Sequence, residues 1–258
     1  LQEEAKRGKT VLLNSHLLSE IERTCDRVAV LRGGKVAAAG RIEDLTATGS
    51  RYKLVATGID DALLAAFRET GASVERVKVM RESIGADIDL MCDINQLWSV
   101  NQAIEIGRRI EPYHLFWLED PTTHDDYPGM ARIADSLTTP IAAGEYHYGI
   151  VPFRHLLEHR SIDIVMIDLL RVGGITQWMK VAGMAEAFNL PVVSHLVPEL
   201  HVHLVAAIPN GLTVEYMPWT LRLYEETPVL DQGHLLVPPR PGLGLAFDQT
   251  ALKRYQIA

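Results

Sequence analysis

Short apolar runs alternate with longer stretches of helical periodicity from about residue 74 onwards. Runs that are apolar on both faces are typical of fully buried parallel strands, and the stretches between them fit helices that cover such a sheet. Val100–Ile110 and Ile175–Phe188 are two of the predicted helices. The predicted strands are Ile88–Cys92, Leu115–Leu118, Pro140–Ala143, Ile164–Ile167, Pro191–Ser194 and Leu212–Val214. This pattern predicts an α/β fold of about six βα units with a parallel sheet.

The first 72 residues have a different pattern. Val28–Leu31 and Val36–Ala39 are short apolar runs on either side of a Gly-Gly pair, which predicts a hairpin. Another strand is predicted at Tyr52–Ala56. We therefore expect a small α+β segment over residues 1–72 and a larger α/β domain over residues 73–258.

An ionisable residue follows each of the six strands predicted in the larger domain. These residues are Asp93, Glu119, Glu145, Asp168, His195 and Glu215. An ionisable side chain at the end of a buried strand is costly unless it has a partner or a metal ion. Parallel strands bring all six residues to one edge of the sheet, which in a (β/α) barrel is the face that carries the active site.

The residue types at this edge indicate two kinds of chemistry. Asp93, Glu119 and Glu145 offer hard oxygen ligands without Cys or His, a set that suits Mg²⁺ better than Zn²⁺. For any single carboxylate, a helix N-cap is the alternative. Asp168 and His195 come from neighbouring units and could form a carboxylate–imidazole pair, in which the Asp fixes the tautomer of the His. A hydrogen-bonded core histidine is the alternative for His195.

Composition excludes several classes of protein. The 258 residues include 25 Lys+Arg and 33 Asp+Glu, and the resulting charge of −8 argues against nucleic acid or an anionic membrane surface as the main partner. No apolar run approaches the roughly 18 residues that a membrane span needs. Two cysteines cannot build a disulfide framework, so we expect a reducing, cytoplasmic compartment.

The motifs at the strand ends resemble the mandelate racemase/muconate lactonizing enzyme branch of the enolase superfamily. The resemblance covers about residues 74–258 and is carried by Asp93-Ile94-Asn95, residues 117–121 (WLEDP), Gly144-Glu145, residues 168–175 (DLLRVGGI), Ser194-His195-Leu196 and Val214-Glu215-Tyr216. It implies an incomplete TIM-type (β/α) barrel, and homo-oligomers are possible by the same resemblance. Residues 215–219 and 240–245 look most like the acid-sugar dehydratases of this branch.

The resemblance also implies roles for the strand-end residues. Asp93, Glu119 and Glu145 would bind Mg²⁺, which stabilises the enediolate formed when a proton α to a carboxylate is removed. Asp168 and His195 would be the acid–base pair. Glu215 would hydrogen-bond the carboxylate of a hydroxy-carboxylate or acid-sugar substrate, with Asn95 and His147 as further substrate contacts. Dehydration is favoured over racemisation, which needs a second base on the opposite face.

The sequence departs from the family pattern ahead of Asp93. A Lys-x-Lys motif is expected near Asp60–Leu64, which contains no lysine, and Lys53 is the nearest candidate. The first barrel strand and the capping domain also have no counterpart. Two alternatives to an active lyase therefore stay open: a catalytically inactive fusion of two truncated domains, or a barrel that the N-terminal strands complete.

A second resemblance lies in the N-terminal segment. Residues 9–22, together with Cys25-Asp26-Arg27-Val28 and Gly34-Lys35-Val36, look like the C-terminal end of an ABC-transporter ATPase domain. His16 matches the switch histidine of that family. No Gly-x-x-x-x-Gly-Lys-Ser/Thr loop occurs in the chain, so nothing would hold a triphosphate and we expect no nucleotide site.

Overall fold

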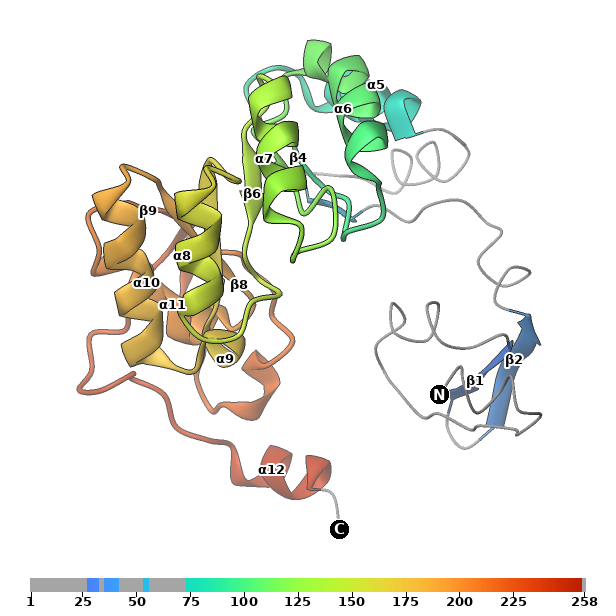
Figure 1. The fold of residues 1–258 in the computed structure, drawn as a ribbon. Helices are drawn as coiled ribbons and strands as arrows, with labels where there is room; N and C mark the ends of the chain where they lie inside the picture. Colours follow the sequence, from blue (N-terminus) through green and yellow to red (C-terminus); the bar gives the residue numbers. More distant parts are fainter. Residues whose placement is uncertain (1–26, 33–34, 42–52, 56–72, 257–258) are drawn as a thin grey trace, which may run out of the picture. The chain divides into compact units, whose positions relative to one another are not determined.

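The computed structural model describes residues 27–32, 35–41, 53–55 and 73–256 (Figure 1). The chain forms two compact units, Leu1–Arg51 and Tyr52–Ala258. In the first unit, strands β1 (Arg27–Arg32) and β2 (Lys35–Arg41) pair antiparallel. This confirms the predicted hairpin.

The second unit is built on a seven-stranded sheet in the order β3-β4-β5-β6-β7-β8-β9. Its strands are β3 (Lys53–Val55), β4 (Met91–Asp93), β5 (Trp117–Glu119), β6 (Ile141–Ala143), β7 (Ile164–Asp168), β8 (Val192–His195) and β9 (Gly211–Thr213). From β4 to β9 every neighbouring pair is parallel. The six predicted strands and the incomplete TIM-type barrel are thereby confirmed.

Strand β3 differs from the others in direction. It pairs antiparallel with β4, and its Lys53 is the register partner of Asp93. The strand predicted around residues 52–56 therefore does lie beside the Asp93 strand, although it runs opposite to the strands of a regular parallel barrel.

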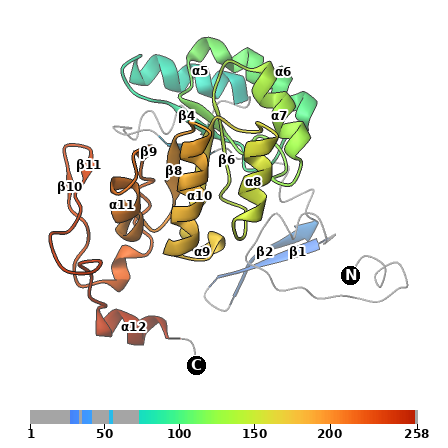
Figure 2. The same ribbon diagram turned by 60° about the vertical axis from the view of Figure 1, so that its left-hand side comes forward.

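Helices alternate with the strands along the chain, and several of them pack against one another, with α5 against α6, α6 against α7 and α8 against α10 (Figure 2). Their bounds are α5 Ser73–Ile84, α6 Val100–Ile110, α7 Tyr127–Ser136, α8 Val151–Glu158, α9 Leu169–Val172, α10 Ile175–Ala187 and α11 Pro198–Ala206. Helix α6 has the predicted bounds, because Ser99 and Gln102 form a capping box at its start. Helix α5 was not predicted.

Both faces of the central strands are buried. On the helix side the strands join a large core that includes Phe153 and Trp178. On the opposite side lies a smaller cluster of strand residues: Trp117, Ala142, Ile164, Met166 and Val193. Because side chains alternate along a strand, Glu119 projects to the same side as Trp117, and this side carries its carboxylate.

The ends of the sheet and of the chain are less enclosed. Strand β9 was predicted to be buried, but all three of its residues are exposed because it is an edge strand. Beyond it come η2 (Leu221–Leu223), β10 (Leu230–Asp231), β11 (His234–Leu235) and α12 (Gln249–Tyr255); η1 (Glu111–Tyr113) follows α6. In the described part of the chain no helix has the length and apolarity that crossing a membrane requires.

Candidate metal and acid–base site

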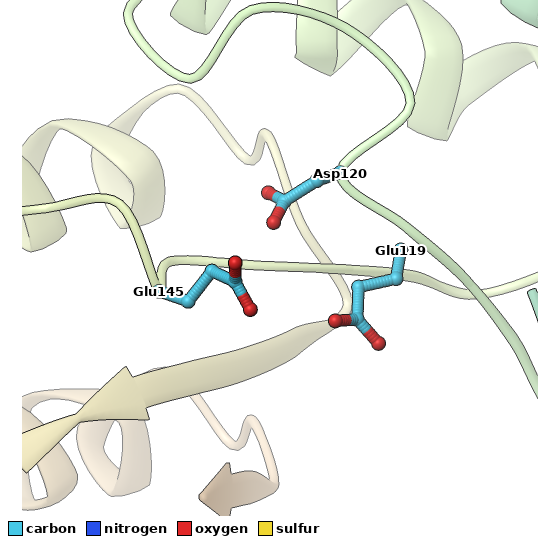
Figure 3. Close-up of side chains that lie close together, drawn as sticks. All are labelled: Glu119, Asp120 and Glu145. Atoms are coloured by element: carbon cyan, nitrogen blue, oxygen red, sulfur yellow. The ribbon is translucent and has the colours of Figure 1, made fainter. Parts of the chain in front are cut away.

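Three carboxylates meet where strands β5 and β6 end. Each of Glu119, Asp120 and Glu145 offers an oxygen within 4.8 Å of the oxygens from the other two, and all three residues are buried. Figure 3 shows the three side chains directed toward one another. Gly144 allows the chain to pass close to β7 just before Glu145. The φ of Gly144 is +137°, and a Cβ on this residue would lie 2.3 Å from the backbone oxygen of Met166.

The electrostatics of this carboxylate cluster are unfavourable in the absence of a cation. Burial raises the pKa of Glu119 and of Asp120 well above the usual values, and charge repulsion within the group raises both further. The pKa of Glu145 is raised by burial too, although His195 opposes the shift. Trp117 Nε1 donates to Glu119 Oε2 at 2.9 Å, whereas neither carboxylate oxygen of Asp120 has a hydrogen-bond partner among the described residues. Such a buried, oxygen-only donor set fits a hard divalent cation.

Asp93 stands beside this cluster rather than inside it. It is the register partner of Glu119 on the neighbouring strand, and its charge raises the pKa values of Glu119, Asp120 and Glu145. Its Oδ1 accepts a hydrogen bond from the backbone N–H of Asn95 at 2.7 Å. The structure thus brings Glu119 and Glu145, two of the three predicted metal ligands, together with Asp120, and Asp93 as a ligand stays a prediction.

The predicted carboxylate–imidazole pair is present at the ends of β7 and β8. His195 Nδ1 lies 2.7 Å from Asp168 Oδ2, and the two residues are register partners. Burial alone would lower the pKa of His195, but the Asp168 hydrogen bond and nearby carboxylates raise it. For Asp168, burial is outweighed by hydrogen bonds from His195 and from the Arg171 N–H, and its pKa is lowered. The other ring nitrogen, Nε2, lies 3.0 Å from Glu145 Oε2, so His195 joins the pair to the carboxylate cluster.

Arg171 and Tyr146 connect the two halves of the site. The Arg171 backbone N–H donates to Asp168 Oδ1, and its Nη1 donates to the backbone oxygen of Glu145 at 2.9 Å. The guanidinium also lies over the Tyr146 ring, 4.9 Å from its centroid. The Tyr146 hydroxyl donates to Asn95 Oδ1 at 2.7 Å, which places Asn95 at the rim of the same site.

Two other predicted residues have different surroundings. Glu215 Oε2 accepts a hydrogen bond from the Leu196 N–H at 2.7 Å, next to the acid–base pair. His147 is buried in a cluster of rings with His124, Tyr127 and Phe153. Burial, together with His124, lowers its pKa to about 4. Its role as a substrate contact stays a prediction.

Sequence reasoning missed Asp120, Arg171 and Tyr146 as members of the site. Each directly follows, or lies close behind, a residue that was predicted: Glu119, Asp168 and Glu145. Asp120 is placed by the backbone after β5, where its φ is +39°, Tyr146 by the turn after β6, and Arg171 by the short helix α9 after β7. These local conformations left no pattern in the sequence.

Comparison with known proteins gives the family. A family model described as enolase C-terminal domain-like matches residues 45–251. The match begins ahead of the predicted domain boundary at residue 73. Residues 9–22 and His16, which carry the ABC-transporter resemblance, lie outside this match and outside the described residues.

Curated relatives and solved structures agree with this match. The chain is 33% identical over 198 residues to D-xylonate dehydratase of Haloferax volcanii, covering 73% of this chain and 48% of that protein. It is 33% identical to L-talarate/galactarate dehydratase of Salmonella typhimurium, covering 71% and 46%. L-Talarate dehydratase from Polaromonas sp. JS666, solved with Mg and L-glucarate, superimposes with a TM-score of 0.68 at 37% identity over 76% of this chain and 53% of that one.

The chain spans about half the length of the curated relatives it matches. The match of the family model covers most of this chain and includes every strand-end residue of the site. The protein therefore belongs to the enolase C-terminal domain-like family, within the enolase superfamily that its strand-end motifs resemble.

Proposed function

We propose that the chain carries the Mg²⁺-binding and proton-transfer half of an acid-sugar dehydratase. The observation that supports this most is the buried cluster of Glu119, Asp120 and Glu145 in contact with the Asp168–His195 pair. The relatives named above are acid-sugar dehydratases, and one of them was solved with Mg and L-glucarate. The substrate class is a hydroxy-carboxylate with a hydroxyl group on the carbon next to the acidic C–H.

Asp93, Glu119 and Glu145 are the proposed Mg²⁺ ligands, one from each of three successive strands. When bound, the ion supplies positive charge for the substrate carboxylate, whose oxygens become more negative as the α-proton leaves. Asp120 is the alternative third ligand, because its oxygens, unlike those of Asp93, lie within the carboxylate cluster. In either set, Glu119 and Glu145 contribute.

His195 is the proposed proton-transfer residue. Because Asp168 holds Nδ1, the proton moves at Nε2. In the dehydration, the α C–H bond breaks, the neighbouring hydroxyl leaves as water, and the enol that remains tautomerises to a 2-keto acid. His195 serves either as the base for the α-proton or as the acid that protonates the departing hydroxyl. Arg171 keeps the pair in place through its backbone bond to Asp168.

Glu215, Asn95 and His147 are the proposed substrate contacts. Glu215 lies next to His195 in the sheet order and would hydrogen-bond the substrate carboxylate, as the resemblance implies. Asn95 is tied to the site by Tyr146. A homo-oligomer is likewise proposed by family resemblance.

Metal binding is tested by isothermal titration of Mg²⁺ into the full chain. We expect Glu119→Gln to weaken binding at least about tenfold. Glu186→Gln, which changes an exposed carboxylate on α10, is the control and should leave affinity unchanged. Asp93→Asn should weaken binding more than Asp120→Asn, and the reverse order would assign the third ligand to Asp120. Equal affinity of wild type and Glu119→Gln would contradict the metal assignment.

Turnover is tested on a panel of aldonates and aldarates by following the 2-keto product. We expect His195→Asn to lower kcat/KM by about 10²–10⁴-fold, the usual contribution of a general acid or base. His203→Asn, on helix α11, is the matched control. If the wild-type chain binds Mg²⁺ but converts no substrate of the panel, the inactive-fusion alternative is favoured instead.

A further inference from the structure

Two histidines stand one helical turn apart at the C-terminal end of helix α8, away from the carboxylate cluster. His155 lies in the last turn of the helix, and His159 is its C-cap with helical backbone angles. Residues four apart on a helix project from the same face. Their ring centroids are 6.4 Å apart and their planes make an angle of 65°. His159 is exposed, and the His155 side chain is about one third exposed, so solvent reaches both rings.

The polar neighbours of the two rings lie on their Nδ1 side, and a hydrogen bond fixes this for His159. His159 Nδ1 lies 2.9 Å from the backbone oxygen of His155, and since a carbonyl oxygen can only accept, Nδ1 carries the hydrogen. In the neutral ring, Nε2 then keeps its lone pair. His155 Nδ1 lies 3.9 Å from Glu158 Oε2, an ion-pair distance beyond hydrogen-bond reach, and the charge of this carboxylate favours a hydrogen on that nitrogen. His159 thus has the arrangement of histidines that bind metals, in which the nitrogen that is not bound to the metal donates to a carbonyl or carboxylate.

A third ring lies against both histidines. Tyr127, at the start of helix α7, has its ring centroid 5.5 Å from that of His155 and 5.9 Å from that of His159. Because the tyrosine ring lies against both imidazoles, each histidine has fewer rotamers to lose when it binds an ion. This lowers the entropic cost of forming a chelate. Two histidines at positions i and i+4 on one helix face can bind a single metal ion, the spacing found in helical zinc sites.

We propose that His155 and His159 bind a divalent transition-metal ion such as Cu²⁺, Ni²⁺ or Zn²⁺ through their Nε2 atoms. Imidazole nitrogen suits these ions, and for a given nitrogen site Cu²⁺ binds tightest among the first-row divalent metals. Mg²⁺ prefers oxygen ligands and does not compete at this position. The chain thus offers two sites that differ in ligand chemistry, the carboxylates at the sheet edge and the imidazoles on α8. The second is independent of the proposed function.

The proposal is tested by titrating Cu²⁺ into the full chain in the presence of saturating Mg²⁺, which occupies the carboxylate cluster. We expect one tight site in the wild type, with electron paramagnetic resonance showing two coordinated imidazole nitrogens. His159→Gln and His155→Gln should each lower the affinity at least about tenfold, because the chelate is lost and one imidazole remains. Mg²⁺ affinity should be the same in both variants and the wild type.

His203→Gln is the matched control, because the His203 Nε2 atom already lies 3.0 Å from the backbone oxygen of Leu243. It should leave Cu²⁺ affinity unchanged. The proposal is wrong if both α8 variants bind Cu²⁺ as tightly as the wild type, or if His203→Gln weakens binding as much as they do. Far-UV circular dichroism of His159→Gln, whose altered side chain is exposed, verifies that the fold is retained.

Discussion

The site has two halves, one at the ends of β5 and β6 and the other at the ends of β7 and β8. The two halves are adjacent and similarly buried, yet the pKa values of their carboxylates are shifted in opposite directions. At the first, Glu119, Asp120 and Glu145 place like charges together, and their pKa values are raised. At the second, Asp168 and His195 are partners of opposite charge: the pKa of the acid is lowered and that of the base is raised. Burial alone therefore does not determine the protonation of these groups, because their partners decide the direction of each shift.

This difference indicates which half of the site requires a ligand that the chain itself does not supply. The acid–base pair is satisfied by groups of this chain, since Asp168 receives hydrogen bonds from the His195 ring and the Arg171 backbone. The carboxylate cluster keeps two oxygens of Asp120 without a hydrogen-bond partner among the described residues. A bound cation would give these oxygens a partner and would offset the repulsion between the carboxylates. Removing one charge from each half should consequently change stability in opposite directions.

The largest change is expected for Asp168→Asn measured without metal. The substitution replaces a charged acceptor of two hydrogen bonds by a neutral one, and a hydrogen bond to a charged group contributes about 1.5–3 kcal/mol. We expect the free energy of unfolding to fall by about 2 kcal/mol in urea denaturation.

Asp163→Asn is the matched control for this comparison. Asp163 Oδ2 accepts the backbone N–H of Ile141 at 2.8 Å and has no imidazole partner among its hydrogen bonds. Its substitution should cost less than that of Asp168. Equal losses would mean that the acid–base pair adds nothing beyond an ordinary carboxylate hydrogen bond.

A smaller change of opposite sign is expected for Glu119→Gln in the presence of EDTA. The glutamine keeps an oxygen acceptor for Trp117 Nε1 while removing one of the buried like charges. We expect unfolding free energy to rise by about 1 kcal/mol, within the range of stabilising substitutions at functional sites. Adding Mg²⁺ should stabilise the wild type more than the variant. Destabilisation of Glu119→Gln in EDTA would show that the cluster is not repulsive.

The parts of this picture that the sequence could predict are those set by periodicity. Strand ends at Glu119, Asp168 and His195 followed from apolar runs, because a buried strand must end where ionisable side chains begin. The bounds of helix α6 followed from the helical periodicity of Val100–Ile110. These are local rules, and they also fixed which residues meet at one sheet edge.

The parts that could not be predicted depend on tertiary geometry. That Asp120 lies within the cluster results from the backbone that follows β5, where its φ is +39°, and no periodic pattern encodes this conformation. The antiparallel direction of β3 and the exposure of β9 reflect their places at the two edges of the sheet. Helix α5 was missed because its polar and apolar positions are only weakly segregated.

A second buried histidine tests whether the partner, rather than burial, sets the charge of His195. His201, on helix α11, has no exposed surface, its Nδ1 lies 2.7 Å from the Leu196 backbone oxygen, and its Nε2 has no hydrogen-bond partner among the described residues. Without a carboxylate partner, burial lowers the pKa of His201 to about 4. The unfolded chain, with a histidine pKa of about 6.5, then binds more protons than the folded chain as the pH falls below 6.5.

His201 therefore contributes stability that is complete above about pH 6.5 and is lost as the pH falls toward 4. Between about pH 7 and about pH 5.5 the loss should be about 1 kcal/mol in urea denaturation. His195 acts with the opposite sign because its folded pKa is raised, so the comparison must be made against His201→Gln, which keeps His195. The variant should lose less stability over this interval than the wild type. Identical pH dependence in the two proteins would mean that His201 does not stay neutral on folding, and that burial without a partner is too weak to separate the two histidines.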